Sequence, residues 1–490
     1  MSSQQPYILP FQFSRFDGDN YLVVNESGEY IFLSNDDFHK LICGELTPDS
    51  PCFYDLKSRH FIATEHLAET LELISAKYRT RKRFISDFTI LHMMVITLRC
   101  CNKCSYCQVR AEGSAASEFD MSPEVARRVV DYIFRSPSPS IKIEFQGGEP
   151  TLNWETLTET VLYAKKINKK YKKHLQFVVC TNLVQIDKRQ LLFFQEHGIH
   201  ISTSLDGPRH LHDKNRVLRS GDGTYDTFIK NLYSAFDILT RGNVNALMTT
   251  TVDNIDHLNE VIEEYVRLGF NGIFIRSLNP YGLAAENVKH LGYPTEHFVK
   301  SFQEALNFII QLNLSGIRFE EFYTCLLLTR ILTPFSTGFV DLQSPSGAGI
   351  SGVIYDYNGD VFPADEARML ARMGDRRFYM GNVFKDSYKS IFGGDLLREI
   401  VSKSCIEIIP YCSSCVYRTY CGSDPVRNYR ETGDLIGKHP DNDFCKKNRL
   451  IFDMLFEKLK RNDPDEMDVF WSWITGQSLK EVRGEKYEAV

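Results

Sequence analysis

Residues Leu98–Arg110 read LRCCNKCSYCQVR and hold four of the 13 cysteines of the chain. Three of them, Cys100, Cys104 and Cys107, follow C-x3-C-x2-C spacing. Thiolates at this spacing can each bind one iron of a 4Fe–4S cube and leave the fourth iron open. The alternative is a zinc site that takes Cys101 as its fourth ligand, but adjacent cysteines rarely reach one tetrahedral ion. The spacing therefore favours a three-cysteine iron–sulfur site in which Cys101 is a bystander.

The segment starts directly after a short apolar run, and similar runs recur along the next part of the chain. The strand candidates are MVITL, IKIEF, LQFVVCT, IHISTSL, VNALMTTT and GIFIR. Amphipathic segments of helical length, such as SPEVARRVVDYIF, separate them. Strands that alternate with helices predict an α/β fold with a parallel sheet, curved into a full or partial barrel. Ligands of such folds collect at the carboxyl ends of the strands, so the loops after the strands are the candidate site.

Bulk composition argues against several other classes. The 490-residue chain is 43% hydrophobic with a formal net charge of −6, which gives no electrostatic reason to expect a nucleic-acid partner. No apolar run approaches the roughly 20 residues of a membrane-spanning helix, and the start MSSQQPYILPFQF lacks signal-peptide features. We therefore expect a cytoplasmic protein of about three domains that binds neither nucleic acid nor a membrane. In that compartment, clustered cysteines indicate metal binding or catalysis rather than disulfides.

Glycine and polar residues follow three further strand candidates. FQGGEP (Phe145–Pro150) ends the second, CTN (Cys180–Asn182) ends the third, and STSLDGPRHLHDKNR (Ser202–Arg216) ends the fourth. Gly147 and Gly148 have no Cβ, which lets the backbone approach a ligand closely. All three segments meet at the same edge of the predicted sheet.

A second group of cysteines lies towards the C-terminus. The stretches CSSCVYRTYCGSDP and DNDFC supply Cys412, Cys415, Cys421 and Cys445. Four thiolates make a closed ligand set that fits zinc and an iron–sulfur cluster equally well. Taken alone, these residues favour zinc.

Three local patterns predict structure around these motifs. YLVVNESGEYIFL alternates about an Asn-Glu-Ser-Gly turn and predicts a hairpin, after which Ser34 is placed to cap a short helix. GVIYDYNGDVF predicts a second hairpin that turns at Asn358 and Gly359. The basic run Tyr78–Arg83 predicts a solvated connector.

Together, the motifs of the first half resemble those of the radical S-adenosylmethionine (SAM) enzymes. The resemblance rests on the C-x3-C-x2-C loop with Tyr106 before its last cysteine, on Gly-Gly-Glu-Pro, and on the Ser-x-Asp-Gly-Pro stretch. It implies a partial (β/α)6 barrel. It also implies that the open iron binds the amino and carboxylate groups of SAM, and that one electron from the cluster splits SAM to give a 5′-deoxyadenosyl radical.

The same resemblance implies which residues contact SAM. They are Gln146, Gly147, Gly148, Glu149, Asn182 and Ser204. The Glu149 carboxylate suits the ammonium group, whereas Leu183 replaces a glycine usual in relatives and weakens the contact expected at Asn182. We expect His210 and His212 to be surface loop residues rather than metal ligands.

The C-terminal cysteines resemble a SPASM domain, the extension of radical enzymes that modify peptides. Full versions bind two auxiliary clusters, but Ala364 and Pro425 stand where ligands of the first are usual. The resemblance thus implies one auxiliary 4Fe–4S cluster, held by the four cysteines of the second group. Asp365 matches an aspartate that acts as a base in sulfatase-maturing relatives; its other interpretation is a turn carboxylate that caps the next helix.

Stretches from nearly the whole chain are similar to the radical maturases of the His-Xaa-Ser repeat system. They are LPFQF, DLKSRHF, CSYCQVR, FPADEARML and CGSDP. The domains expected on this basis are a small α+β unit like peptide-recognition domains (1–84), the barrel (85–335), a SPASM-like auxiliary cluster domain (336–450) and a helical tail (451–490).

The resemblance implies an enzyme that abstracts hydrogen from a residue of a ribosomally synthesised precursor peptide or protein. An electron donor such as flavodoxin or ferredoxin would supply the electron, and cross-linking, oxidation or epimerisation can each follow. One alternative is an anaerobic sulfatase-type formylglycine maturase, against which the missing ligands of the first auxiliary cluster count. An alternative of another class is a zinc-stabilised peptide-binding protein without turnover.

Overall fold

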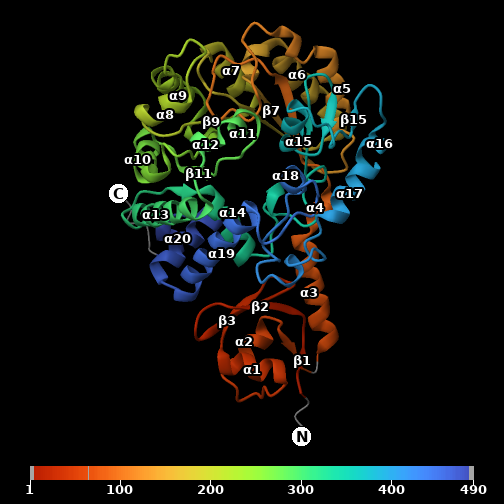
Figure 1. Ribbon diagram of the computed structural model, residues 1–490, viewed down its shortest axis with the longest axis vertical. Helices are drawn as coiled ribbons and strands as arrows, with labels where there is room; N and C mark the ends of the chain where they lie inside the picture. The colour runs from red at the N-terminus through yellow and green to blue at the C-terminus, as the bar shows by residue number, and fades with distance from the viewer. Residues whose placement is uncertain (1–4, 65, 485–490) are drawn as a thin grey trace. The chain divides into compact units, whose positions relative to one another are not determined.

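The computed structural model describes residues 5–64 and 66–484 and forms two compact units, each assembled from several stretches of chain (Figure 1). Unit 1 comprises the described residues of 1–86, 324–347 and 400–470. Unit 2 comprises those of 87–323, 348–399 and 471–490.

A ten-stranded sheet forms the centre of unit 2, in the order β12-β11-β10-β9-β8-β7-β6-β13-β14-β15. Its strands are β6 (Leu91–Thr97), β7 (Ser140–Gly147), β8 (His174–Cys180), β9 (Ile199–Ser204), β10 (Val244–Thr249), β11 (Gly272–Arg276), β12 (Glu320–Glu321), β13 (Gly352–Tyr355), β14 (Asp360–Phe362) and β15 (Gly381–Asn382). Strands β6 to β11 are the six predicted from the sequence, and each pairs in parallel with the next. The predicted α/β fold class is confirmed.

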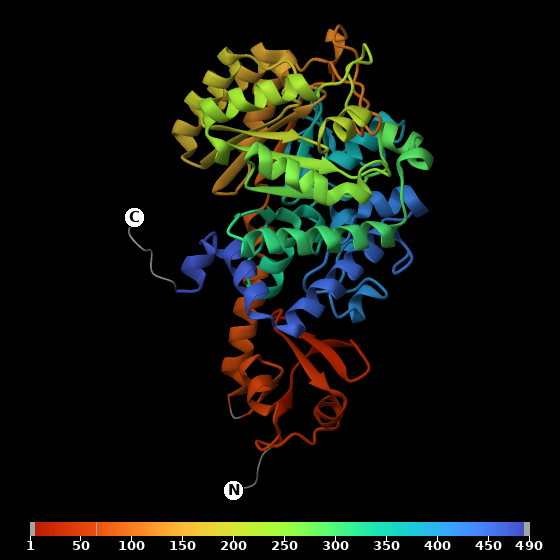
Figure 2. The same cartoon turned by 90° about the vertical axis from the view of Figure 1, so that its left-hand side faces the viewer.

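Six of the helices that connect these strands lie along the outer side of the sheet (Figures 1 and 2). They are α5 (Pro123–Ile133), α6 (Trp154–Tyr171), α7 (Lys188–His197), α9 (Tyr225–Leu239), α10 (Leu258–Leu268) and α13 (Thr295–Leu314). The short helices α8 (Arg209–Asn215), α11 (Gly282–Glu286) and α12 (Val288–Leu291) lie near the loop Leu98–Arg110 instead. Side-chain caps fix the first residues of α5 and α7. Ser122 accepts a hydrogen bond from the Val125 amide at the start of α5, and Asp187 with Gln190 forms a capping box at α7.

Residues beyond the barrel extend the same sheet. The hairpin predicted at Asn358 and Gly359 is confirmed, because β13 and β14 pair antiparallel. The sequence did not indicate that β13 also pairs in parallel with β6, from Gly352 opposite Leu91 onwards. Helices α15 (Asp365–Arg372) and α16 (Tyr388–Phe392) complete this part of unit 2.

Unit 1 begins with a small α+β region. A three-stranded antiparallel sheet contains β2 (Phe11–Arg15), β3 (Asn20–Asn25) and β4 (Tyr30–Ser34), and a second, two-stranded sheet pairs β1 (Tyr7–Ile8) with β5 (Ile62–Ala63). The helices of this region are α1 (Asn35–Cys43), α2 (Phe53–Ser58), α3 (Leu67–Arg81) and α4 (Arg83–Asp87). The predicted hairpin is β3–β4, and Ser34 caps α1 as expected.

The expectation of a solvated connector at the basic run Tyr78–Arg83 is wrong. Arg81 is only 9% exposed and donates hydrogen bonds to the carbonyl oxygens of Ser27, Arg330 and Thr333. A charged side chain is buried here because backbone carbonyls replace its lost hydration.

The remaining helices lie in the last third of the chain, apart from α14. They are α14 (Phe322–Leu332), α17 (Asp395–Lys403), α18 (Pro425–Thr432), α19 (Asp443–Arg461), α20 (Pro464–Thr475) and α21 (Leu479–Val482). Within the described residues, none of the helices combines the length and apolarity needed to cross a bilayer.

Candidate active site

A cavity of about 450 Å³ opens at the carboxyl ends of the barrel strands in unit 2. Cys100, Cys104 and Cys107 from the loop after β6 form part of its wall. The other predicted site residues in its wall are Gln146, Gly147, Gly148, Asn182, Ser204 and Asp365. The structure therefore brings most of the site residues predicted from the sequence around one space. Cys101 is buried but is not among the lining residues.

The two glycines are needed for contact between strand and loop. The Gly148 amide donates to the Thr97 carbonyl at 2.8 Å, and the next amide donates to the Arg99 carbonyl at 2.7 Å. A Cβ on Gly148 would lie 2.3 Å from the Arg99 oxygen, and one on Gly147, at φ +132°, would lie 1.9 Å from the Thr97 oxygen. The sequence indicated close approach to a ligand; the structure shows that the close partner is the backbone that leads into the cysteine loop.

Replacing Gly148 with alanine is expected to lower the free energy of unfolding by about 1–3 kcal/mol, because backbone must move to admit the methyl group. Gly113→Ala is the matched control, since nothing lies within 4 Å of its Cβ position. We expect the control to change stability by less than about 0.5 kcal/mol. Urea unfolding followed by circular dichroism measures both, and equal midpoints for the two variants would refute this account of the contact.

Glu149 points into the protein rather than lining the cavity. Its Oε1 accepts hydrogen bonds from the hydroxyls of Thr151 at 2.7 Å and Thr181 at 2.8 Å, and its Oε2 accepts the Asn182 amide at 2.7 Å. The side chain is 1% exposed, and burial raises the pKa of its carboxyl above the ordinary value. Glu149 thus fixes the end of β8 relative to β7.

Asn182 connects this arrangement to the cysteine loop. Its Nδ2 lies 3.6 Å from the sulfur of Cys100 and 3.6 Å from that of Cys101, while its Oδ1 accepts the Val184 amide. Leu183, fully buried, adopts φ +60°. That left-handed conformation favours glycine, the residue that the resemblance led us to expect at this position.

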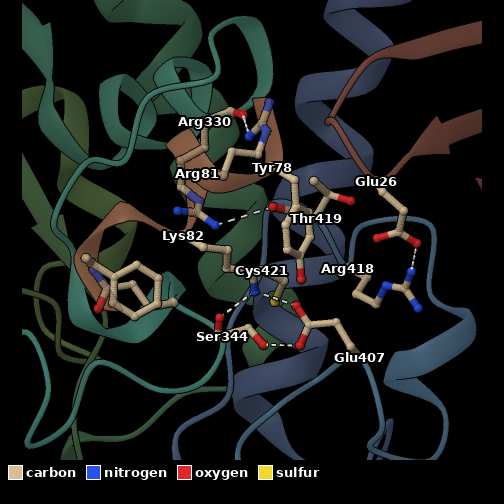
Figure 3. Close-up of a pocket in the computed structure, with 12 residues that line it drawn as sticks. Glu26, Tyr78, Arg81, Lys82, Arg330, Ser344, Glu407, Arg418, Thr419 and Cys421 are labelled. Carbon is tan, nitrogen blue, oxygen red and sulfur yellow. Dashed lines mark hydrogen bonds and ion pairs between the residues drawn. The ribbon is translucent and has the colours of Figure 1, made fainter. Parts of the chain in front are cut away.

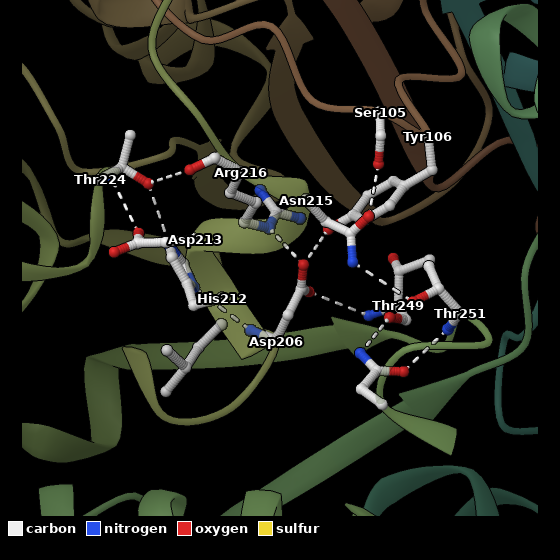
Figure 4. A network of polar contacts seen from close by, with 12 residues as sticks. Ser105, Tyr106, Asp206, His212, Asp213, Asn215, Arg216, Thr224, Thr249 and Thr251 are labelled. Carbon is white, nitrogen blue, oxygen red and sulfur yellow. Dashed lines mark hydrogen bonds and ion pairs between the residues drawn. The ribbon is translucent and has the colours of Figure 1, made fainter. Parts of the chain in front are cut away.

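A buried network supports the cysteine loop from the β9 side (Figure 4). Asp206, fully buried, accepts hydrogen bonds from the Tyr106 hydroxyl and from Arg216 Nε, the latter at 3.1 Å. The Arg216 guanidinium lies over the Tyr106 ring at 5.4 Å. Burial alone would lower the pKa of Arg216, but Tyr106 and Asp206 raise it above its ordinary value. The Asp-Gly-Pro stretch therefore helps to hold the loop in place, a role that the sequence motif did not reveal.

His212 is not a surface residue, contrary to expectation. It is 2% exposed, its Nδ1 accepts the Asp206 amide at 3.4 Å, and its Nε2 lies 3.1 Å from the Thr224 hydroxyl. Burial lowers the pKa of this imidazole to about 3, so it is neutral at physiological pH. His210 is exposed, as expected.

The cavity wall also holds residues that were not selected from the sequence, among them Glu144, Cys180 and Arg276. Glu144 Oε1 accepts Gln146 Nε2 at 2.5 Å and lies 3.5 Å from the Cys180 sulfur. Their positions near the carboxyl ends of β7, β8 and β11 are the signal that could have found them. Cys180 faces the cavity, and burial raises the pKa of its thiol.

Asp365 is the first residue of α15, and its Oδ1 accepts Arg368 Nε at 3.2 Å. Its side chain is 21% exposed and lines the cavity. Ala364 is the N-cap residue and supplies no side-chain cap. The carboxylate therefore has one fixed partner and an open side towards the cavity.

The second cysteine group lies in unit 1, where its four thiols line one small cavity. Cys412 and Cys415 come from a short 3-10 turn, Cys421 follows in a loop, and Cys445 lies in the first turn of α19. The Cys445 amide donates to Asn442 Oδ1 at 2.7 Å, which fixes the start of that helix. Burial raises the pKa of the Cys445 thiol to about 11, so binding a metal would release protons from these groups.

Both thiol sets fit iron–sulfur clusters by their donor chemistry. Three thiols share a cavity in unit 2 and four share a cavity in unit 1, the ligand numbers of clusters with an open iron and without one. Within residues 5–64 and 66–484, no three Cys, His, Asp or Glu side chains are grouped closely enough to hold a single metal ion.

A family model matches much of the barrel. The model of the Radical SAM superfamily matches residues 94–265. Strands β7 to β10 and the end of β6 thus lie in a stretch that is similar to radical SAM domains. The match and the related maturases make the chain an enzyme whose cofactors include a 4Fe–4S cluster and SAM.

A curated relative and two solved structures cover most of the chain. The cysteine-type anaerobic sulfatase-maturating enzyme of Clostridium novyi (strain NT) is 22% identical over 372 residues, 73% of this chain and 92% of the relative. The structure of native anSMEcpe with bound AdoMet and Cp18Cys peptide has a TM-score of 0.64 at 21% identity and covers 76% of this chain and 98% of that one. Streptococcus suis SuiB bound to precursor peptide SuiA has a TM-score of 0.54 at 13% identity, over 89% and 99%. These likenesses confirm the radical SAM fold.

Proposed function

We propose that the enzyme modifies a residue of a ribosomally synthesised peptide or protein. The observation that carries this proposal is the cavity of unit 2, which is lined by three thiols on one side and by Glu144, Cys180, Arg276 and Asp365 among its other residues. A 4Fe–4S cluster held by the thiols, with SAM on its open iron, would supply the 5′-deoxyadenosyl radical. The remaining polar wall would then orient the substrate residue.

Within this proposal, backbone and side-chain groups of the cavity wall bind SAM. Gly147 and Gly148 offer backbone carbonyls for the ammonium group, and Gln146, Asn182 and Ser204 offer polar side chains within the cavity wall. Glu149 would act through the position of Asn182 rather than by touching SAM, since its oxygens already accept hydrogen bonds from the protein.

Similar structures with bound peptides support a peptide substrate. The Cp18Cys peptide and the precursor peptide SuiA are bound in two of the similar structures. In unit 1, β2 is an edge strand of its sheet, and Phe13 on it is 50% exposed. We propose that a leader segment adds a strand to this sheet, and that the substrate belongs to a His-Xaa-Ser repeat system.

The second group of cysteines would hold one auxiliary 4Fe–4S cluster. Flavodoxin or ferredoxin is the proposed electron donor. Cross-linking, oxidation and epimerisation all remain compatible with the cavity.

Sulfatase maturation, the conversion of a cysteine or serine to formylglycine, is a second candidate. It is favoured by the likeness to the Clostridium novyi enzyme and by Asp365 in the cavity wall. Ala364 and Pro425, in place of ligands usual for another auxiliary cluster, count against it.

The experiment is anaerobic reconstitution with iron and sulfide, followed by reduction with dithionite in the presence of SAM. We expect two 4Fe–4S clusters per chain and release of 5′-deoxyadenosine. Co-expression with a small His- and Ser-rich peptide encoded nearby should then change the mass or stereochemistry of that peptide. Zinc in place of iron and sulfide would refute the proposal and favour a binding protein.

Asp365→Asn separates the two enzyme candidates. If Asp365 is the base of a formylglycine maturase, this variant should lose about 10²–10⁴-fold in turnover of a cysteine-containing sulfatase peptide. Wild-type activity on that peptide, combined with no change in the His- and Ser-rich peptide, would transfer the assignment to sulfatase maturation.

A further inference from the structure

The turn of the N-terminal hairpin in unit 1 contacts the chain between two cysteines of the second group. We call Asn25–Glu29, between β3 and β4, the hairpin turn, and Cys415–Cys421 the cysteine loop. Three consecutive residues of the loop reach the turn. Arg418 pairs with Glu26, the Thr419 hydroxyl donates to the Asn25 carbonyl at 3.2 Å, and the Tyr420 hydroxyl donates to the Gly28 carbonyl at 3.0 Å.

The hairpin turn is itself rigid, which makes it an effective anchor. Asn25, 2% exposed, uses its Oδ1 to accept the Ser27 amide at 3.1 Å, the Ser27 hydroxyl at 2.7 Å and the Glu29 amide at 3.1 Å. Its Nδ2 donates to the Arg59 carbonyl at 2.7 Å. These bonds fix the turn within the N-terminal region independently of the cysteine loop.

Two arginines add a second link between the hairpin turn and the cysteine loop. Arg81 Nε donates to the Ser27 carbonyl and its Nη1 to the Arg330 carbonyl, each at 2.7 Å. Arg330 Nε in turn donates to the Tyr420 carbonyl at 2.8 Å. Tyr420 is fully buried. The loop residue next to Cys421 is therefore held by its hydroxyl and by its carbonyl.

Arg418 extends this hold to the first cysteine pair, because its Nη1 donates to the carbonyl of Ser413, which lies between Cys412 and Cys415. Its side chain is only 10% exposed. Glu26 is the acidic partner that keeps this guanidinium in place.

Charge is concentrated around Cys421. Cys421 lines a cavity of about 20 Å³ together with four cationic and two acidic residues (Figure 3). They are Arg81, Lys82, Arg330, Arg418, Glu26 and Glu407. Lys82 contacts the Ser344 carbonyl and the Glu407 carboxylate. Cationic side chains therefore outnumber acidic ones beside the thiol of Cys421. The charge close to a cluster ligand is one of the factors that set the reduction potential of the cluster.

We propose that the hairpin turn is a positioning element of the second cysteine site, through which the N-terminal region sets the geometry and reduction potential of the bound cluster. The inference rests on the proposed function, in that the four thiols hold a 4Fe–4S cluster. It goes beyond it by giving the N-terminal hairpin a role in cofactor chemistry in addition to docking a peptide.

The test replaces Glu26 in full-length protein that also carries alanine at Cys100, Cys104 and Cys107, so that only the second cluster contributes a signal. Glu26→Gln removes one negative charge and leaves Arg418 unpaired. Reduction adds one electron to the cluster, so the midpoint potential should move to a more positive value in a dithionite titration followed by electron paramagnetic resonance. Glu26→Asp, which keeps the charge, should restore the parent potential.

Three further variants separate the effect of position from general damage to the fold. Asp36→Asn removes an equal charge from an exposed pair with Lys40 in the same region and should leave the potential unchanged. Gly28→Ala would place a Cβ 2.1 Å from Arg81 Nη2 at φ +83°, and we expect it to lower the iron and sulfide bound per chain. Gly44→Ala, at φ +71° with no close neighbour, carries the same backbone strain without the clash and should retain the cluster.

The outcomes are distinct for the two proposals. Parent protein that binds no iron–sulfur cluster at the second site would overturn both the proposed cofactor and this inference. Parent protein with a cluster, in which Glu26→Gln and Gly28→Ala match the parent in potential, spectrum and iron content, would overturn the inference alone.

Discussion

Alanine in place of Cys100, Cys104 and Cys107 together is expected to abolish formation of 5′-deoxyadenosine. In the proposed site each thiolate would bind a different iron, and all three would be needed to hold a cube whose fourth iron is open for SAM. The variant should retain one cluster per chain, that of the second cysteine group. Iron and sulfide analysis, with chromatography of the nucleoside after reduction, measures both results.

Cys101→Ala is the control for this experiment. Its thiol is buried next to Cys100 but is not part of the cavity wall, so we expect iron content and SAM cleavage close to wild type. If Cys101→Ala lost the cluster while one of the other three tolerated alanine, the ligand assignment would be wrong.

Asp206→Ala is expected to lower the free energy of unfolding by about 3–5 kcal/mol, because it leaves the Arg216 guanidinium buried without its carboxylate. Arg216 is 11% exposed at the side chain and Asp206 is not exposed at all. The Tyr106 hydroxyl and the Thr249 amide would lose their acceptor as well. The loop Leu98–Arg110, which contains Tyr106, should consequently bind its cluster less tightly. Urea unfolding and iron retention on a desalting column measure the two effects.

Two comparisons test the cause. Asp226→Ala removes an exposed ion pair with Arg209 in the same domain and should cost at most about 1 kcal/mol. The double variant Asp206→Leu with Arg216→Met should be less destabilised than Asp206→Ala alone, because no charge then remains buried without a partner. Additive losses in the double variant would contradict the buried-charge account.

Local sequence rules predicted the barrel strands and their order, because apolar alternation and glycine punctuation reflect local structure and the solvent exposure of each face. They could not predict the pairing of β13 with β6, which joins residues about 260 positions apart. Nothing in the four residues of β13 distinguishes a strand that ends a hairpin from one that also extends a barrel. The burial of Arg81 could not be predicted from the sequence for the same reason, because its carbonyl partners come from distant segments.

Most of the candidate site could be predicted because thiol spacing is a local property and the strand ends converge. The exceptions are informative. Glu149 was expected at the ligand, but its position after a glycine turn inserts it between two strands, where Thr181 and the Asn182 amide occupy its oxygens. His212 lies in a polar stretch that reads as a loop, yet α8 carries it beneath the Asp206 network. The direction in which such side chains point depends on tertiary packing, which the spacing of residues in the sequence does not specify.

The scattered make-up of unit 1 has a consequence for how the protein is made. Its first stretch ends at Ser86, whereas its last ends at Phe470. At 5–20 residues per second, the ribosome needs roughly 20–80 s to synthesise the chain between them. Arg81 lacks the Arg330 and Thr333 carbonyls until the middle stretch has been made. The hairpin of β3 and β4 lacks the cysteine loop until the last stretch follows. Unit 1 can therefore be completed, with its four thiols brought to one cavity, only after its last stretch has been synthesised.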